Sequence, residues 1–381
     1  MIEVERIKEY PTPYYLYDLN LLDKTLSEIK KCISGKPVRV HYAIKANGNP
    51  LIIKHIAEAG LGADCVSGGE IKAAMEAGFR NDSIFYAGVG KTDSEIIEGI
   101  ECSIGCFNVE SVEELEVIAE IADKMDKKVC VALRVNPDID AHTHHYITTG
   151  LEENKFGIDM RRIEEAAYKA MSCPNIELIG LHFHIGSQIT TMEPFRILCE
   201  RINRLTSEFR AKGIEFRILN VGGGLGIDYD DPDANPIPDF KGFFDTLVSN
   251  LELTDGQEIH CELGRSIVAQ CGSLISRVTF VKNGINHKFV ILDAGMSDLL
   301  RPALYGAHHA IRNLSGLDRE KTEVYDVVGP ICESSDVFAK GETLPETKRG
   351  DIFAIHSAGA YGESMASTYN MRPLPRAIYL A

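Results

Sequence analysis

Eight short apolar segments recur at regular intervals along the chain, and this rhythm narrows the possible folds more than any other feature of the sequence. Helical patterns separate them, as at 68–78 and 111–125, and another at 20–33 precedes the first. Ser111 followed by Glu114 has the spacing of a capping box. The apolar segments are 38–44, 61–67, 83–89, 104–110, 128–136, 176–187, 216–224 and 258–266. Strand and helix alternating eight times is typical of a (β/α)8 barrel, and an open doubly wound sheet is the alternative.

The first apolar segment ends in a lysine. Within "VRVHYAIKANGNP" (38–50), the alternation of Val38 to Ile44 has the period of two that predicts a β-strand, and "NGNP" ends it. Lys45 is therefore expected at the carboxyl end of the first strand. A surface lysine that extends its ammonium into water is the simplest explanation. Whether Lys45 has a functional role therefore depends on the residues that surround it in the fold.

Polar residues follow the other apolar segments in the same way. They are Asp64, Ser67, Asn108, Arg134, Asn136, His182, His184, Ser187, Gly222, Gly223, Gly224, Glu262 and Arg265. In a (β/α)8 barrel the chemistry collects at the carboxyl ends of the strands. This clustering therefore predicts that the barrel is an enzyme.

The rhythm changes after about residue 267, where strand-like segments are separated by turns rather than by long helices. This pattern predicts a mostly antiparallel β domain, which the extended N-terminal segment "EYPTPYYLYD" is expected to join. The predicted domains are a barrel over 20–266 and a β domain made of 1–19 plus 267–381.

Composition excludes several classes of function. The formal net charge of −16 disfavours nucleic acid and anionic membranes as partners, and no apolar run is long enough to span a bilayer. The N-terminus has no apolar core of a signal peptide, and ten scattered cysteines without a C-x-x-C pair fit the reducing cytoplasm. We expect no metal: Cys102 and Cys106 have no second pair, and the histidines of 141–150 have no carboxylate at ligand spacing.

Three neighbouring strand ends predict a phosphate site. "NVGGGLGID" (220–228) offers bare backbone amides, "HIGSQ" offers Ser187, and "ELGRS" offers Arg265. A plain tight turn is the alternative explanation of the three glycines. A phosphate site opposite Lys45, with Glu262 available to keep a ring nitrogen protonated, points to pyridoxal phosphate held on the lysine as a Schiff base. His184 could stack on the ring.

The motifs "HYAIKAN", "GADCVSGGE", "LHFHIGSQ", "ELGRS", "DAGMSDLLRPALY", "GPICESSD" and "SAGAYG" resemble those of the fold type III pyridoxal-phosphate decarboxylases. The resemblance runs from about residue 10 to the end, in the family's order. It implies a homodimer with shared active sites. One departure is Leu263, where most relatives carry proline, which leaves that turn less rigid.

The resemblance also assigns roles to residues. The implied catalytic residues are Lys45, as the Schiff-base lysine, and Cys332, as the general acid reaching in from a second subunit. The implied cofactor contacts are Lys45, His184, Ser187, Gly224, Glu262, Gly264, Arg265 and Tyr361. The implied substrate contacts are Arg265, Arg301, Tyr305, Glu333 and Tyr361, with Glu333 recognising the substrate's distal amine.

The implied reaction is loss of CO₂ from meso-2,6-diaminopimelate to give L-lysine. Ornithine, arginine or a carboxylated polyamine are alternative substrates within the family. A cofactor-binding homologue without activity remains a further alternative, although Lys45 and Cys332 are both present. An alanine racemase would need arginine where Glu262 faces the ring nitrogen.

Overall fold

The computed structural model of the chain describes residues 9–137 and 155–380. Its contacts divide the chain into two compact units. The barrel unit comprises Leu26–Gly226 and Asp239–Gly264, and the β unit comprises Met1–Thr25, Ile227–Pro238 and Arg265–Ala381. The division assigns the acidic segment 227–238 to the β unit, and the predicted domain bounds remain a prediction.

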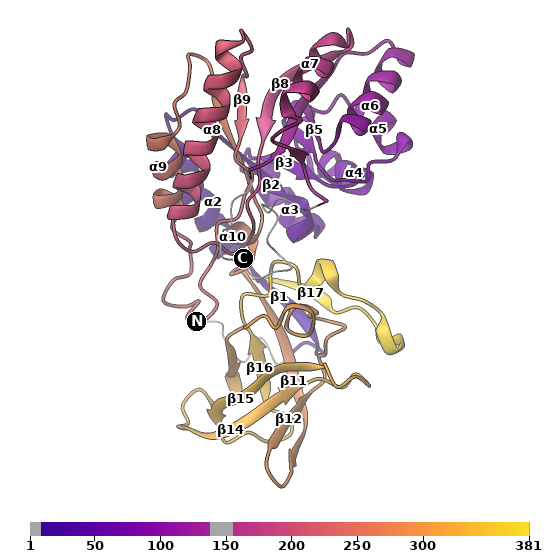
Figure 1. Cartoon of the computed structure of the whole chain (residues 1–381). Helices are drawn as coiled ribbons and strands as arrows, with labels where there is room; N and C mark the ends of the chain where they lie inside the picture. The colour runs from indigo at the N-terminus through magenta and orange to yellow at the C-terminus, as the bar shows by residue number, and fades with distance from the viewer. Residues whose placement is uncertain (1–8, 138–154, 381) are drawn as a thin grey trace. The chain divides into compact units, whose positions relative to one another are not determined.

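The barrel unit is a closed ring of eight parallel strands (Figure 1). In spatial order each strand pairs with the next, and the pairing of β5 with β6 closes the ring. The strands are β2 (Val38–Ala43), β3 (Gly62–Cys65), β4 (Ile84–Tyr86), β5 (Cys106–Val109), β6 (Val129–Asn136), β8 (Ile176–His182), β9 (Ile218–Asn220) and β10 (Glu258–Leu263), with the short β7 (Ile158–Asp159) added to β6. All eight predicted strands are confirmed, and the closed ring excludes the open sheet.

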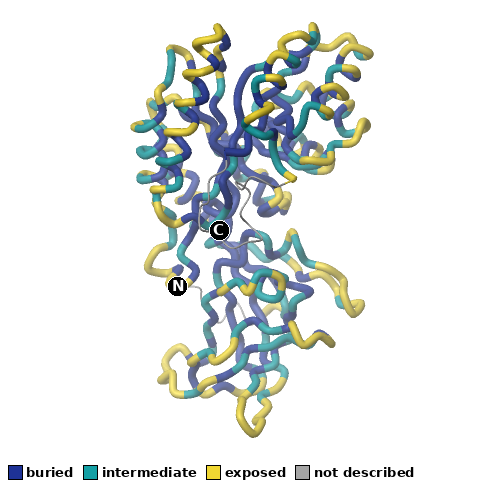
Figure 2. Tube along the Cα trace, in the orientation of Figure 1, coloured by how far each residue is buried: buried dark blue, intermediate teal, exposed yellow. Residues whose placement is uncertain are grey.

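Helices surround the strands of the barrel unit (Figure 1). They are α2 (Leu19–Ile33), whose first residues are counted with the β unit, α3 (Pro50–Glu58), α4 (Gly68–Ala77), α5 (Asp93–Glu101), α6 (Val112–Lys124), α7 (Ile163–Ser172), α8 (Glu193–Ala211) and α9 (Phe240–Asn250). Short 3-10 turns occur at η1 (Ile44–Ala46) and η2 (Asn81–Ser83). Burial follows this arrangement, because the strands are buried and the outer faces of the helices are exposed (Figure 2).

The start of α6 departs from the predicted capping box. The Ser111 side chain accepts a hydrogen bond from the Glu114 amide, as expected for an N-cap. However, the Glu114 carboxylate accepts from the Glu110 amide at 2.8 Å and from Lys91 at 2.6 Å. The reciprocal half of the box is absent in this described region, since a buried lysine recruits the carboxylate instead.

The first strand is buried on both faces, as strands of a parallel barrel are. Its alternation therefore does not separate a core face from a solvent face. His41 lies in the core, with Nε2 2.9 Å from Nδ1 of His260 on β10 and Nδ1 3.1 Å from the Ser83 carbonyl oxygen. Burial lowers the pKa of His41 to about 4.

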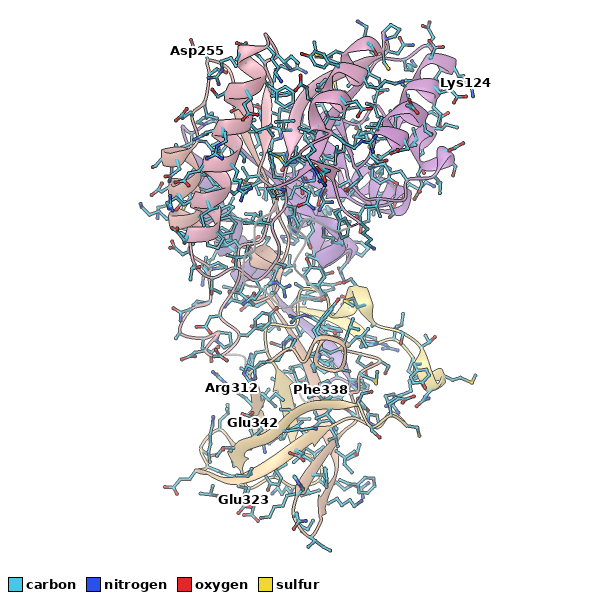
Figure 3. All side chains as sticks on the ribbon, viewed as in Figure 1. Lys124, Asp255, Arg312, Glu323, Phe338 and Glu342 are labelled. Atoms are coloured by element: carbon cyan, nitrogen blue, oxygen red, sulfur yellow. The ribbon has the colours of Figure 1, made fainter. Side chains whose placement is uncertain are left out.

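The β unit contains a mostly antiparallel sheet, which confirms the predicted fold class. Its strands are β1 (Tyr14–Asp18), β11 (Gly272–Asn283), β12 (Lys288–Leu292), β13 (Ile311–Asn313), β14 (Lys321–Val328), β15 (Val337–Pro345), β16 (Ile352–Ile355) and β17 (Arg376–Leu380). Its helical segments are α10 (Arg265–Val268), α11 (Arg301–Tyr305), η3 (Leu314–Gly316), η4 (Glu363–Met365) and η5 (Tyr369–Met371). The N-terminal strand β1 joins this sheet as predicted, between β11 and β17. Phe338 on β15 is buried, whereas Glu323 on β14 forms an ion pair with Lys288 on β12 (Figure 3).

Candidate functional site

Lys45 lies in η1, the turn that directly follows β2. Its side chain is exposed at this end of the strand, as the sequence predicted. The ammonium acts electrostatically on Asp64, Glu70 and Glu262, since it lowers the pKa of each of these carboxyl groups against the effect of burial. An amine close to two buried acids and one half-buried acid is therefore available at the carboxyl end of the barrel.

Asp64 is the most unusual of these acids. It is 1% exposed, and in the part of the chain that the structure describes its Oδ1 atom has no hydrogen-bond partner. Burial, followed by repulsion from Glu262, raises the pKa of Asp64 well above its usual value. A buried carboxyl with an unused oxygen next to a lysine is an arrangement that suits a functional site rather than a stable core.

Glu262, the penultimate residue of β10, is held by three side-chain donors. Asn108 and Asn220 donate to Oε1 at 3.1 and 2.8 Å, and Nε2 of His182 lies 3.1 Å from Oε2. Burial alone would raise the pKa of Glu262, but His182, His184 and Lys45 hold it well below its usual value. Glu262 is consequently an ionised carboxylate of fixed orientation.

His184 follows β8, two residues after His182. The Gly223 amide donates to its Nδ1 at 3.2 Å, which leaves the ring hydrogen on Nε2 and fixes the ring plane. Burial, with Arg134 and Lys45, lowers the pKa of His184 well below its usual value. The side chain is thus a neutral flat ring, which suits stacking on an aromatic cofactor.

The glycine turn after β9 allows very close packing of the backbone. A Cβ atom at Gly223 would lie 1.9 Å from the Glu262 carbonyl oxygen, so no other residue fits there. Gly224 has φ of +115°, and its carbonyl oxygen accepts at 2.8 Å from the amide of Ile189, two residues beyond Ser187. The tight turn and the anion site are therefore compatible explanations, since the same glycines that pack closely also expose amides.

A buried ion-pair network supports the loops at the carboxyl ends of the barrel strands. Arg134 donates to Glu110 at 2.7 Å, and Glu110 also accepts from the amides of Gly88 and Gly157. Lys91, 1% exposed in its side chain, bonds Glu114 at 2.6 Å. These pairs link the ends of β4, β5 and β6, so they fix the loops that carry the site.

Within the β unit, two arginines surround Tyr229. The Tyr229 hydroxyl accepts from Nη1 of Arg265 at 2.7 Å, and the guanidinium of Arg301 lies 4.8 Å from the centre of the Tyr229 ring. Both arginines are 6% exposed. Burial lowers the pKa of Arg301, and repulsion from Arg265 contributes to this change. Two desolvated cations side by side are suited to bind an anion.

His309 holds Arg301 in place. Nη1 of Arg301 donates to Nε2 of His309 at 2.8 Å, and Nδ1 of His309 donates to the His356 carbonyl oxygen at 2.8 Å. Since the guanidinium can only donate, His309 is the neutral tautomer with its hydrogen on Nδ1. Tyr305 ends the same short helix, α11, that begins with Arg301.

Tyr361 lies beside Arg265, whose guanidinium is 5.0 Å from the centre of its ring. Its φ of 56° is in the left-handed region, which is costly for a tyrosine. The preceding segment is fixed by hydrogen bonds from Ala358 to Gly272 and from Gly359 to Ala269. The structure thus brings Arg265, Arg301, Tyr305 and Tyr361 into one cluster, and their roles as substrate contacts stay a prediction.

Cys332 and Glu333 are exposed residues of the β unit. The Cys332 amide donates to Oδ1 of Asn370 at 3.2 Å, and the Tyr369 hydroxyl donates to Glu333 at 2.5 Å. Both residues are therefore tied to the segment 369–370. Their predicted roles stay a prediction.

The remaining predicted residues are placed as follows. Ser187 is half-buried after β8, and Gly264 follows Leu263, which is buried and paired with Tyr42. The segment 141–150 lies outside the described residues. Among the described residues there is no cluster of metal-binding side chains and no helix long and apolar enough to cross a membrane.

Sequence reasoning missed Tyr229 and His309. Tyr229 lies in the acidic, proline-rich segment 228–240, whose composition is typical of solvated surface, yet it is 9% exposed. For Tyr229, the available sequence signal was its position in "GIDY", shortly after the glycine turn. For His309, it was the short distance in sequence from "RPALY".

The fold and the site define the class of protein. A parallel barrel that carries a lysine, an ionised glutamate, a flat neutral histidine and a glycine turn at one end fits a pyridoxal-phosphate enzyme. Residues of this barrel suit each part of that cofactor: Lys45 its aldehyde, Glu262 its ring nitrogen, and the Gly222–Gly224 amides its phosphate.

The comparisons with known proteins identify the family. Residues 19–269 match the pyridoxal-binding domain of the pyridoxal-dependent decarboxylases, and the chain belongs to this family. It is 54% identical to diaminopimelate decarboxylase of Bacteroides thetaiotaomicron, over 98% of this chain and 96% of that protein. The diaminopimelate decarboxylase of Helicobacter pylori in complex with L-lysine is 40% identical, with a TM-score of 0.92 over 99% of this chain and 94% of that chain. A lysine/ornithine decarboxylase of Vibrio vulnificus, with 21% identity and a TM-score of 0.85, shares the fold.

Proposed function

We propose that the chain removes CO₂ from meso-2,6-diaminopimelate to form L-lysine, with pyridoxal phosphate as its cofactor. The observation that carries this proposal is the 54% identity with a diaminopimelate decarboxylase over nearly the whole of both chains. The anion-binding arginine cluster around Tyr229 supports it, because the substrate is a dicarboxylic acid.

The barrel residues act on the cofactor end of the site. The amine of Lys45 would hold the cofactor through its aldehyde, and the neutral ring of His184, fixed by the Gly223 amide, would stack on the cofactor ring. Glu262, through its fixed carboxylate, would hold a proton at the ring nitrogen of the cofactor. When bound, the cofactor supplies an electron sink for the electron pair left at Cα as CO₂ departs.

The phosphate and the substrate divide the anion-binding groups between them. Ser187, Gly224, Gly264, Arg265 and Tyr361 bind phosphate in this proposal. Arg301 binds the distal carboxylate of the substrate through its planar guanidinium, with Tyr305 beside it. Glu333 pairs with the distal ammonium. This recognition of a distal amino-acid group distinguishes diaminopimelate from ornithine, which lacks the second carboxylate.

Cys332 completes the reaction by returning a proton. The bond between Cα and the carboxyl carbon breaks, CO₂ leaves, and the thiol of Cys332 donates a proton to Cα, which solvent later restores to the sulfur. The product then carries one carboxylate fewer than the substrate.

The proposal includes a homodimer whose subunits share active sites. Cys332 and Glu333 are exposed and tied to a segment with unusually exposed apolar side chains, namely Tyr369 (47%), Met371 (97%) and Leu374 (54%). A second copy that covers these side chains would bring both polar residues to its own barrel. Ten free thiols fit the reducing cytoplasm as the compartment.

Subunit mixing tests the shared site. Lys45→Ala and Cys332→Ala should each be inactive, because each lacks one half of the chemistry. Mixed at equal amounts under exchange, half of the dimers carry both changes, and each such dimer has one intact site. About a quarter of the wild-type activity should therefore return; no recovery despite exchange would contradict shared sites.

The substrate assignment is tested with purified protein and added cofactor. Incubation with meso-diaminopimelate should release CO₂ and L-lysine, detected by chiral chromatography, whereas ornithine and arginine should release little. An Arg301→Met variant should lose preference for the dicarboxylic substrate. Faster release of CO₂ from ornithine by the wild type would overturn the assignment.

A further inference from the structure

Glu262 is surrounded by donors that are themselves uncharged amides and an imidazole. Asn108 and Asn220 are 0% exposed and His182 is 1% exposed, so water does not compete for the carboxylate from their side. The three distances of 2.8 to 3.1 Å are those of good hydrogen bonds. The carboxylate therefore has three permanent partners before any ligand arrives.

The tautomer of His182 follows from its contacts. An ionised carboxylate can only accept, so Nε2 of His182 carries a hydrogen and donates it to Oε2 of Glu262. Nδ1 is buried and has no hydrogen-bond partner among the described residues. A second hydrogen there would be a buried donor without an acceptor, which is costly, so the neutral tautomer is favoured.

The donors to Oε1 are held as firmly. The amide oxygen of Asn220 accepts from the Gly222 amide at 2.9 Å, which fixes which end of the Asn220 side chain faces Glu262. The main-chain oxygen of Asn108 accepts from Lys91 at 2.8 Å. The network thus connects the glycine turn and Lys91 to the carboxylate of Glu262.

We propose that His182, assisted by Asn108 and Asn220, is a positioning residue that keeps Glu262 ionised and thereby keeps a proton on the ring nitrogen of the bound cofactor. This inference rests on the proposed function, in which Glu262 faces that nitrogen. It goes beyond it by assigning the protonation of the ring to residues behind Glu262, which touch neither cofactor nor substrate.

The physical reason is that each hydrogen bond to a carboxylate weakens its affinity for a proton. A neutral donor does so without cancelling the negative charge, so the charge remains available to the ring nitrogen. A cation hydrogen-bonded to the carboxylate in the place of His182 would offset part of that negative charge. The other titratable groups that act on Glu262 or are acted on by it are Lys45, His184, Asp64, His41, Cys106 and Cys261.

Loss of one donor has a defined consequence. Loss of a hydrogen bond to a charged group raises the pKa of the carboxylate by about one to two. The proton in question is shared between the ring nitrogen of the cofactor and a carboxylate oxygen of Glu262. In His182→Phe its preference for the ring nitrogen should therefore fall about ten- to a hundredfold. Phenylalanine fills a similar volume without the donor, whereas His182→Gln retains an amide donor of similar reach and should restore the wild-type balance.

The test is nitrogen NMR of the holoenzyme loaded with pyridoxal phosphate that carries the heavy nitrogen isotope in its ring. In the wild type the shift should be that of a protonated ring nitrogen across the neutral range of pH. In His182→Phe it should move towards the unprotonated value, and in His182→Gln it should return. Unchanged shifts in His182→Phe, with cofactor bound, would overturn the proposal.

Two controls keep the result interpretable. Asn108→Leu removes a donor to the other oxygen, and because Oδ1 of Asn108 accepts no hydrogen bond from the described residues, the substitution leaves no donor without an acceptor. Asn108→Leu is the test to use if His182→Phe does not fold. Its nitrogen signal should move towards the unprotonated value, and an unchanged signal in Asn108→Leu would count against the proposal. A wild type that fails to bind the cofactor would instead contradict the proposed function itself.

Discussion

Replacement of His309 is expected to weaken substrate binding without a comparable loss of turnover. Arg301 and His309 are 6% and 1% exposed, and the 2.8 Å hydrogen bond between them is the contact that orients the guanidinium. His309 also packs edge-on against Tyr229, with ring centres 5.1 Å apart. His309→Phe retains this aromatic packing and removes the acceptor.

The size of the effect follows from the hydrogen bond. A buried hydrogen bond to a charged group contributes about 1.5–3 kcal/mol, which corresponds to about ten- to a hundredfold in binding. In the proposed role, Arg301 would bind the distal carboxylate equally in ground state and transition state, so the loss should raise KM and leave kcat within about threefold. His309→Gln keeps an acceptor for Arg301 and serves as the matched control.

Steady-state kinetics with meso-diaminopimelate, together with thermal melts of each variant, form the assay. The account predicts a raised KM in His309→Phe, partial recovery in His309→Gln, and similar melting temperatures. A KM within about twofold of wild type in a stably folded His309→Phe would refute the reasoning.

Three further predictions concern the rest of the molecule. Tyr229→Phe removes the acceptor for Arg265, so pyridoxal phosphate should bind about tenfold more weakly while phosphate-free pyridoxal binds equally well, as measured by equilibrium titration. Burial lowers the pKa of His41 from 6.5 to about 4, so the unfolded state takes up more protons between these values and stability falls as pH decreases through this window. Denaturant unfolding should show a loss of about 2 kcal/mol from this residue between about pH 7 and about pH 5, and His41→Phe should flatten the dependence. Lys91→Met strands a buried carboxylate partner and should cost about 3–5 kcal/mol of stability, whereas the exposed Lys124→Met should cost little (Figure 3).

The barrel could be predicted from the sequence because its signals are local. Each strand is a short apolar segment followed by a helix, so spacing alone located all eight. Lys45, His182 and Glu262 were expected at strand ends for the same reason, since parallel strands bring their carboxyl ends to one edge. The resemblance then supplied roles that spacing does not carry.

The supporting contacts could not be predicted in this way. Hydrogen bonds from Asn108 and Asn220 to Glu262 join residues 154 and 42 positions apart. Pairing of β9 with β10 brings Asn220 beside Glu262, and the curvature of the barrel brings Asn108 on β5 to the same carboxylate. Tyr229 lies among acidic residues that indicate solvent, yet two arginines bury its ring. The predicted capping-box contact of Glu114 was wrong for a similar reason, because its carboxylate binds Lys91, which comes from another part of the chain.

The central claim is that Lys45 carries the cofactor, and borohydride trapping tests it most directly. The protein is incubated with pyridoxal phosphate, reduced with borohydride, digested and sequenced by mass spectrometry. The account predicts one pyridoxyl-modified peptide with the modification on Lys45, and its absence in Lys45→Ala. Modification of a different lysine, or of none, would contradict the account.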